Sequence, residues 1–199
     1  MVVLFALEYM TALGMTMQLL FLDSRRSRGR TVLTVYGTTA LVMMAVASIY
    51  LTAGPDTALR TYTLIAHVPA LLLLLALSRF RGWRMVFQLF SSILFCTLVQ
   101  HAAGLVYYLS GARFWALILA YAVLSAGVIL FLVCFLCPLF FRTLLELRQG
   151  WWLMCLVMAI YYVIIIYLIP GYVGLTLSST ILKPAVSLLM AGFYSVLIF

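Results

Sequence analysis

The stretch FWALILAYAVLSAGVILFLVCF, residues 114–135, decides the fold of this chain. It contains no charged side chain, and it exceeds the roughly 20 apolar residues that a helix needs to cross the hydrocarbon core of a bilayer. Apolar and polar residues do not alternate along it, as they would in a barrel strand. In hydrocarbon the backbone polar groups must be paired within the protein, and a helix pairs them. The sequence therefore predicts an all-α membrane protein.

Apolar stretches of the same character lie on both sides of this one. The whole chain is 67% hydrophobic and 8% charged, whereas a water-soluble domain is about 45–50% apolar and about 25% charged. Seven spans use most of the 199 residues, so we expect a single transmembrane domain over residues 1–199 and no soluble catalytic domain. The predicted spans are 2–22, 31–51, 62–77, 85–109, 114–135, 151–169 and 184–199.

The basic residues are distributed unevenly between the gaps that separate these spans. Nine of the twelve lie in the first, third and fifth gaps. Because cytoplasmic loops retain an excess of Lys and Arg, the amino terminus is predicted outside and the carboxyl terminus inside. The net charge of +8 is spread over short gaps rather than one basic face, which favours contact with membrane lipid and excludes nucleic acid as a partner. The odd-numbered gaps hold Arg25, Arg26, Arg28, Arg30, Arg79, Arg81, Arg84, Arg142 and Arg148, and the even-numbered gaps hold Arg60, Arg113 and Lys183.

Several segments depart from a regular span. The third predicted span is short and contains Pro69, so we expect it to be kinked, little tilted or extended outward through Thr61. Residues 137–150 mix apolar and charged side chains, which predicts a helix lying at the cytoplasmic interface, with Arg142 and Glu146 paired one turn apart. Tryptophans at predicted interfaces are expected to act as anchors. They are Trp83, Trp115, Trp151 and Trp152.

The two ends of the chain carry separate expectations. The first span contains Glu8 and lacks a basic start and a small-residue cleavage site, so it is predicted to be retained rather than removed as a signal peptide. The last predicted span covers only about 24 Å, less than the hydrocarbon core of about 30 Å. It stops on apolar residues, so we expect a fragment of a protein that continues into the cytoplasm.

Polar and ionisable residues inside the spans are the candidates for a functional site, because such groups are costly in hydrocarbon. With the predicted orientation they gather in the outer half of the membrane, where they could line an extracellular half-pocket that binds a ligand. These candidate ligand-binding residues are Glu8, His67, Gln100, His101, Tyr108 and Lys183.

Two helical stripes offer a structural alternative to this site. Polar and small residues at membrane helix interfaces also serve packing and hydrogen bonding alone. Two histidines and one carboxylate could in principle bind a metal, but no local ligand spacing supports this, so neither a metal nor another cofactor is expected. The stripes are Glu8, Thr11, Met15 and Gln18 in the first span, and Ser92, Cys96, Gln100 and Gly104 in the fourth.

Catalysis by these residues is not expected. The sequence shows no nucleophile with an accompanying base, no glycine-rich phosphate loop and no paired carboxylates. The four cysteines lie within or beside apolar spans, which is typical of small core side chains rather than of disulfides. They are Cys96, Cys134, Cys137 and Cys155.

Three stretches resemble the amino-terminal membrane region of GHKL-type sensor histidine kinases of Gram-positive bacteria, which are similar in layout to peptide receptors of quorum sensing. The stretches are HVPALLLLLALSRFRGWRMVFQLF at 67–90, RQGWWLMCLVMAIYYVIIIYLIPGY at 148–172 and ILKPAVSLLMAGFYSVLIF at 181–199. The resemblance implies a homodimer in the cell membrane whose last span leads to a cytoplasmic helix with a phosphoacceptor histidine and an ATP-binding domain. Neither segment is among these 199 residues, so neither activity is assigned to them.

The expected function is reception of an extracellular or membrane-borne signal, such as a peptide or small molecule, and its relay through the last span to a kinase. Two alternatives remain open on the sequence. A small transporter or channel subunit would use Glu8, His67 and His101 to line a route, although only Gln18 and Gln88 are available in the inner half. A structural partner in a membrane complex would tolerate substitution of the outer polar residues.

Overall fold

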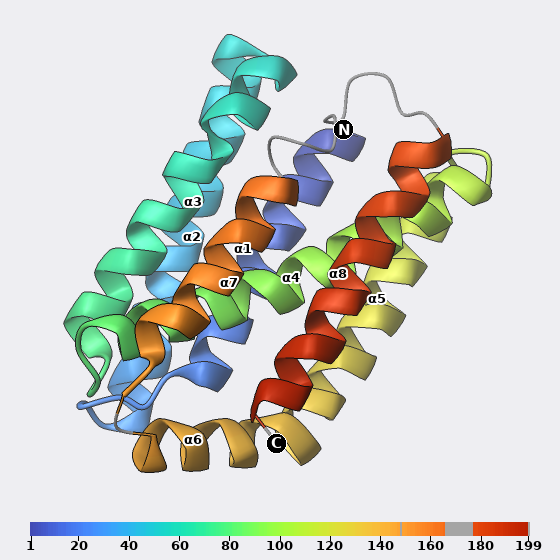
Figure 1. The fold of residues 1–199 in the computed structure, drawn as a ribbon. Helices are drawn as coiled ribbons and strands as arrows, with labels where there is room; N and C mark the ends of the chain where they lie inside the picture. The colour runs from blue at the N-terminus through green and yellow to red at the C-terminus, as the bar shows by residue number, and fades with distance from the viewer. Residues whose placement is uncertain (148, 166–176, 199) are drawn as a thin grey trace. The chain divides into compact units, whose positions relative to one another are not determined.

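The computed structural model describes residues 1–147, 149–165 and 177–198. Within these residues the regular structure is helical, and six helices are long and apolar enough to cross a membrane (Figure 1). The predicted all-α bundle is confirmed, and the chain is a multi-pass membrane protein. The elements are α1 (Val2–Phe21), α2 (Arg28–Ala53), α3 (Pro55–Leu77), α4 (Trp83–Leu109), α5 (Phe114–Phe131), the π-helix η1 (Leu132–Leu136), α6 (Cys137–Glu146), α7 (Trp151–Val163) and α8 (Leu177–Ile198).

The third span begins earlier than its predicted limit at residue 62. Gly54 has a φ of +87°, which favours glycine, and Pro55 then occupies the first helical position. The helix is 23 residues long, so the expected extension through Thr61 is confirmed. Arg60 therefore lies near the start of α3 rather than in a gap.

The last span also begins earlier than predicted. α8 starts at Leu177 and continues through Pro184, the first residue of the predicted span. A membrane helix tolerates an interior proline because neighbouring groups satisfy the freed carbonyl. Its 22 residues cover about 33 Å, so the expectation of a span shorter than the hydrocarbon core is wrong. α7 is shorter, and predicted residues 166–169 of its span lie outside the described part of the chain.

The helix predicted at 137–150 is present as α6 and ends at Glu146. Phe140 and Leu144 are fully buried, whereas Arg142 and Glu146 are exposed and form the predicted ion pair, with 2.8 Å between Nε and Oε1. This division into an apolar and a charged face is typical of an interfacial helix. η1 joins α6 to α5, so that the helix continues from Phe114 to Glu146.

The tryptophans divide into two groups. Trp83, Trp115 and Trp152 are more than half exposed, as expected of interfacial anchors. Trp151 is buried, and its indole nitrogen donates to the carbonyl of Leu147 at 3.0 Å. The anchor interpretation is therefore wrong for Trp151, because this side chain faces the protein and satisfies a carbonyl at the end of α6.

The chain divides into two compact units, Met1–Ser92 and Ile93–Phe199, and α4 contributes to both. In the first unit, α1, α2 and α3 pack against one another. The buried face of α3 presents residues four apart, Ala58, Tyr62, Ala66 and Ala70. Three of these are alanines, and small side chains allow membrane helices to approach closely.

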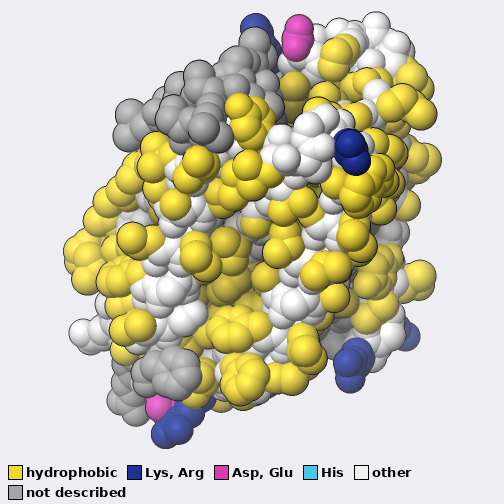
Figure 2. Space-filling model, turned by 90° about the vertical axis from the view of Figure 1, so that its right-hand side faces the viewer, with side chains coloured by type: hydrophobic (Ala, Val, Ile, Leu, Met, Phe, Trp, Pro, Cys, Tyr) yellow, Lys and Arg dark blue, Asp and Glu magenta, His cyan; other side chains and the backbone are white. Residues whose placement is uncertain are grey.

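Large apolar side chains remain exposed on helices of both units. Leu33 and Leu41 of α2, Val123 of α5 and Leu189 of α8 are each more than 60% exposed. Figure 2 shows apolar side chains over most of the visible face. Exposed apolar surface of this extent fits contact with lipid chains rather than water.

Candidate functional site

The predicted site residues belong to both units. Glu8 and His67 lie in the first unit, and the other four lie in the second. Both residues of the first unit are half-buried, Glu8 in α1 and His67 in α3. The surroundings of Glu8 and His67 are therefore described within the first unit, and those of the other four residues within the second unit.

The stripe on α1 proves to be a helix contact. The hydroxyl groups of Thr11 and Tyr62 lie 3.2 Å apart, and the Nε2 of Gln18 donates to the carbonyl of Ala70 at 2.6 Å. Both bonds join α1 to α3, and Thr11 and Gln18 are buried. The structural alternative for this stripe is thus confirmed at these two positions. This interpretation as a contact between α1 and α3 is not extended to Glu8, at the start of the stripe.

In the second unit, four polar side chains form a hydrogen-bonded chain between α4, α7 and α8. The Nδ1 of His101 lies 2.8 Å from the Oγ of Ser187, which lies 2.9 Å from the Tyr161 hydroxyl. That hydroxyl in turn lies 3.1 Å from the Oγ1 of Thr97. We call Thr97, His101, Tyr161 and Ser187 the polar cluster. Ser187 and Tyr161 are buried, and Thr97 and His101 are half-buried.

Helical spacing places these residues. Thr97 and His101 lie four residues apart on α4 and therefore share a face. Ser187 lies in α8, one turn beyond Lys183. Aromatic packing supports the same contact between helices, since the rings of Phe95 and Tyr194 meet edge to face at 5.6 Å. The polar cluster therefore joins three helices.

The direction of each hydrogen bond in the cluster follows from its last member. Thr97 donates its hydroxyl hydrogen to the carbonyl of Leu94 at 2.9 Å, so it accepts from Tyr161. Because the hydroxyl hydrogen of Tyr161 is donated to Thr97, the Tyr161 oxygen accepts a hydrogen bond from Ser187. The hydroxyl hydrogen of Ser187 is donated to Tyr161, so the Ser187 oxygen accepts a hydrogen bond from the Nδ1–H of His101. Each member of the cluster therefore donates to the next one, and the series runs from His101 to the carbonyl of Leu94.

This order fixes what the cluster can do. His101 carries hydrogen on Nδ1, and in its neutral form the other ring nitrogen, Nε2, is an acceptor. Ser187 is not set up as a nucleophile, because the histidine nitrogen that faces it is a donor rather than a base. The arrangement instead makes Ser187 the link through which α8 is tied to both α4 and α7.

The remaining predicted residues lie near the cluster or on the same helices. Lys183 is half-buried and lies close enough to His101 to act on it electrostatically. Gln100, next to His101 in α4, is buried, and Tyr108 is half-buried two turns further along. The structure thus places Lys183 within electrostatic range of His101.

Tyr161, Ser187 and Thr97 were absent from the predicted site. Two were difficult to recognise because Tyr161 sits in an apolar run beside Tyr162, and Ser187 is a small residue typical of helix packing. Thr97 could have been found, since it precedes His101 by one turn. Only the packing of α7 shows that Tyr161, rather than the less buried Tyr162, faces the protein.

Other chemistry is not apparent among the described residues. No three His, Cys, Asp or Glu side chains gather there in a way that could hold a metal ion. The four cysteines are free thiols, with Cys96, Cys137 and Cys155 buried and Cys134 exposed. In comparisons with known proteins, no protein-family model, curated protein or solved structure matches this chain.

Proposed function

We propose that this chain is a membrane-embedded signal-reception domain in which the polar cluster sets the position of α8. The observation that carries the proposal is the placement of Ser187, a fully buried residue of α8 that bonds to residues of α4 and α7 at once. A ligand shifts a helix only if it binds one arrangement better than another. A group that competes for His101 or Ser187 would have this effect.

A second contact holds the other end of α8. Thr143 of α6 donates to the carbonyl of Ile198 at 3.2 Å. Release at the polar cluster would therefore change the strain on an end that is held by an interfacial helix. This is the geometry expected of an element that passes a signal along its axis to whatever follows it.

The resemblance to GHKL-type sensor kinases supplies the proposed output. In that interpretation α8 leads to a cytoplasmic kinase, and the signal is an extracellular or membrane-borne peptide or small molecule. Sequencing the gene beyond the codon for Phe199 tests this part. A helix with a phosphoacceptor histidine followed by an ATP-binding domain would support the kinase, and a stop codon would overturn it.

Reception is preferred over transport because of the inner glutamines. A transport route would need polar groups across the full membrane. Gln18 donates to the carbonyl of Ala70 and Gln88 to that of Phe21, so both side chains hold helices together. The two glutamine side chains therefore stabilise the packing of the helices rather than line a route for a proton or solute.

Two substitutions at His101 test the coupling of the cluster to α8. Asparagine can place an amide donor near the position of Nδ1, whereas glutamine reaches toward the position of Nε2. H101N is therefore expected to keep α8 in place, and H101Q is expected to release it. Spin labels at Leu119 of α5 and Leu189 of α8, both exposed to lipid, report their separation by electron paramagnetic resonance in nanodiscs.

These labels require cysteines at the two positions and replacement of the four native cysteines. The expected result is an unchanged distance distribution for H101N and a shifted or broadened one for H101Q. Equal distributions in H101Q and the labelled parent would show that the cluster does not position α8, and would overturn the proposed coupling.

A further inference from the structure

The gaps after α1 and α3 lie side by side at one end of the first unit (Figure 1). Ser24 and Ser78 form an antiparallel β-bridge. The backbone nitrogen of Arg25 donates to Leu77 at 2.9 Å, and that of Arg79 donates to Asp23 at 2.8 Å. Two segments more than 50 residues apart in sequence are thus joined through their backbones.

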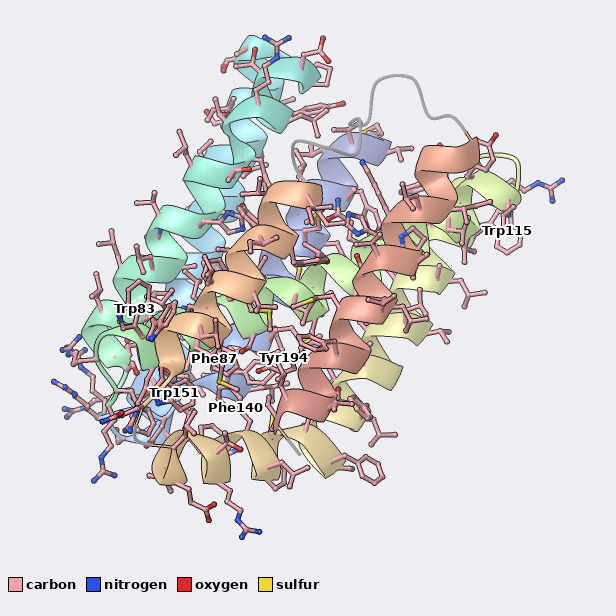
Figure 3. The ribbon with its side chains drawn as sticks, viewed as in Figure 1. Trp83, Phe87, Trp115, Phe140, Trp151 and Tyr194 are labelled. Atoms are coloured by element: carbon pink, nitrogen blue, oxygen red, sulfur yellow. The ribbon has the colours of Figure 1, made fainter. Side chains whose placement is uncertain are left out.

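This junction concentrates positive charge. We call residues 22–30 and 78–84 the arginine loop pair. It contains seven arginines and one acidic residue, Asp23. Six of the arginines are exposed, and the seventh, Arg84, is half-buried with its guanidinium over the ring of Phe80 at 5.8 Å. Figure 3 shows the nitrogen-tipped side chains that gather at this end, near Trp83. The seven are Arg25, Arg26, Arg28, Arg30, Arg79, Arg81 and Arg84.

A buried glutamine holds the two loops in register. Gln88 of α4 is fully buried, accepts from the hydroxyl of Ser78 at 2.8 Å and donates to the carbonyl of Phe21 at 2.9 Å. Phe21 ends α1, and Ser78 directly follows α3. The backbone that carries the arginines is therefore fixed before any partner binds, which reduces the entropy that binding must overcome.

The positions of some arginines are unfavourable without an anion. α2 starts at Arg28 and α4 at Trp83, so Arg28, Arg30 and Arg84 lie in first helical turns. The amino-terminal end of a helix carries a partial positive charge and disfavours cations. Orientation of the chain requires basic residues only somewhere in a cytoplasmic gap. A local conflict of this kind is expected where a bound partner compensates for it.

The surroundings indicate a lipid as that partner. Leu33 of α2, one turn beyond Arg30, is 75% exposed, and Trp83 is 57% exposed. The arginines therefore border the apolar surface that faces lipid chains. A headgroup phosphate is held at this depth by its own acyl chains, and guanidinium groups match phosphate oxygens through paired hydrogen bonds.

From this geometry we propose that the arginine loop pair binds the phosphate of an anionic phospholipid headgroup. The site is formed by both loops together and depends on the backbone bonds between them. It shares no residue with the polar cluster, and it stands or fails independently of signal reception.

The experiment measures lipid preference in the purified full chain. Nanodiscs expose both membrane faces. The orientation of the inserted chain therefore does not affect whether lipid can reach the loops. Spin-labelled phosphatidylglycerol and phosphatidylcholine report the fraction of each lipid held at the protein. We expect the chain to prefer phosphatidylglycerol, and R25Q/R28Q/R79Q/R81Q to reduce this preference about tenfold or more, because each basic residue near an anionic surface contributes severalfold.

Two controls make the result specific. R60Q/R113Q removes arginines outside the loop pair and is expected to keep the preference. Q88M keeps all seven arginines and the backbone bonds between the loops while removing the two side-chain bonds of Gln88, and is expected to lose part of the preference. Helical content and gel-filtration behaviour establish that each variant is folded.

Three outcomes would overturn the proposal. The first is equal retention of both lipids by the parent chain. The second is an equal loss in R60Q/R113Q and in the loop-pair variant, which would indicate general charge attraction. The third is displacement of phosphatidylglycerol by millimolar inorganic phosphate, which would indicate a site for a free anion.

Discussion

Replacing Ser187 with alanine is expected to lower the free energy of unfolding by about 1–2 kcal/mol, whereas Y161F should cost only about 0.6 kcal/mol. The difference follows from the direction of the hydrogen bonds. Without the Ser187 hydroxyl, the Nδ1–H of His101 loses the acceptor that lies 2.8 Å away. A donor left buried without a partner costs more than a lost pair.

The tyrosine substitution is milder because its neighbours can adjust. In Y161F, Thr97 still donates to the carbonyl of Leu94. Ser187 loses its acceptor, but a serine hydroxyl inside a helix can rotate toward the carbonyl one turn earlier. The aromatic ring also remains, so the packing of the buried residue is retained.

Titration of each variant with SDS from mild detergent micelles, followed by circular dichroism, measures this difference. S125A is the matched control, since Ser125 is also buried and its hydroxyl bonds within α5, to Ala122. A larger loss for Y161F than for S187A would contradict the bond order that we derive, and with it the assignment of hydrogen to Nδ1 of His101.

The helices could be predicted from the sequence because membrane spans depend on local composition. The bounds of α1 and α4 agree with the prediction to within two residues. α3 and α8 were placed too short for a shared reason. The predicted spans begin just after Arg60 and Lys183, whereas α3 includes Arg60 and α8 includes both Lys183 and Pro184. A helix ends where its hydrogen bonding ends, and neither feature stops it in these surroundings.

The site was harder to predict than the spans, because it depends on which helices are neighbours. The cost of burial drew attention to His101, which the structure places in the polar cluster, and to Lys183 on α8. His101 contacts Ser187 of α8, 86 residues away, and Thr97 contacts Tyr161 of α7, 64 residues away, and no local pattern specifies such a meeting. The inner glutamines were noted as possible lining of a route, and their bonds to backbone carbonyls appear only in the fold.

Replacing Gln88 with methionine is expected to give the largest loss of stability in the first unit, about 2–3 kcal/mol. Methionine has a similar volume, so the effect reports the amide group rather than a cavity. The fully buried hydroxyl of Ser78 loses its acceptor, and the carbonyl of Phe21 loses the donor that Gln88 supplies at the end of α1.

Q18M is the matched comparison for this substitution. Gln18 is also buried, and it donates to the carbonyl of Ala70. Ala70 lies inside α3, where the helix supplies its own donor to that carbonyl. The expected cost is therefore about 0.6 kcal/mol, the average for a hydrogen bond between membrane helices.

The same SDS titration distinguishes these two variants, and protease accessibility of residues 22–30 and 78–84 adds a local measure. Q88M is expected to expose both segments to cleavage after arginine, and Q18M is expected to leave them protected. Similar stability and protection in the two variants would mean that the backbone bridge between Ser24 and Ser78 holds the loops without Gln88. In that case Q88M would also retain its lipid preference, because the arginines would stay in register.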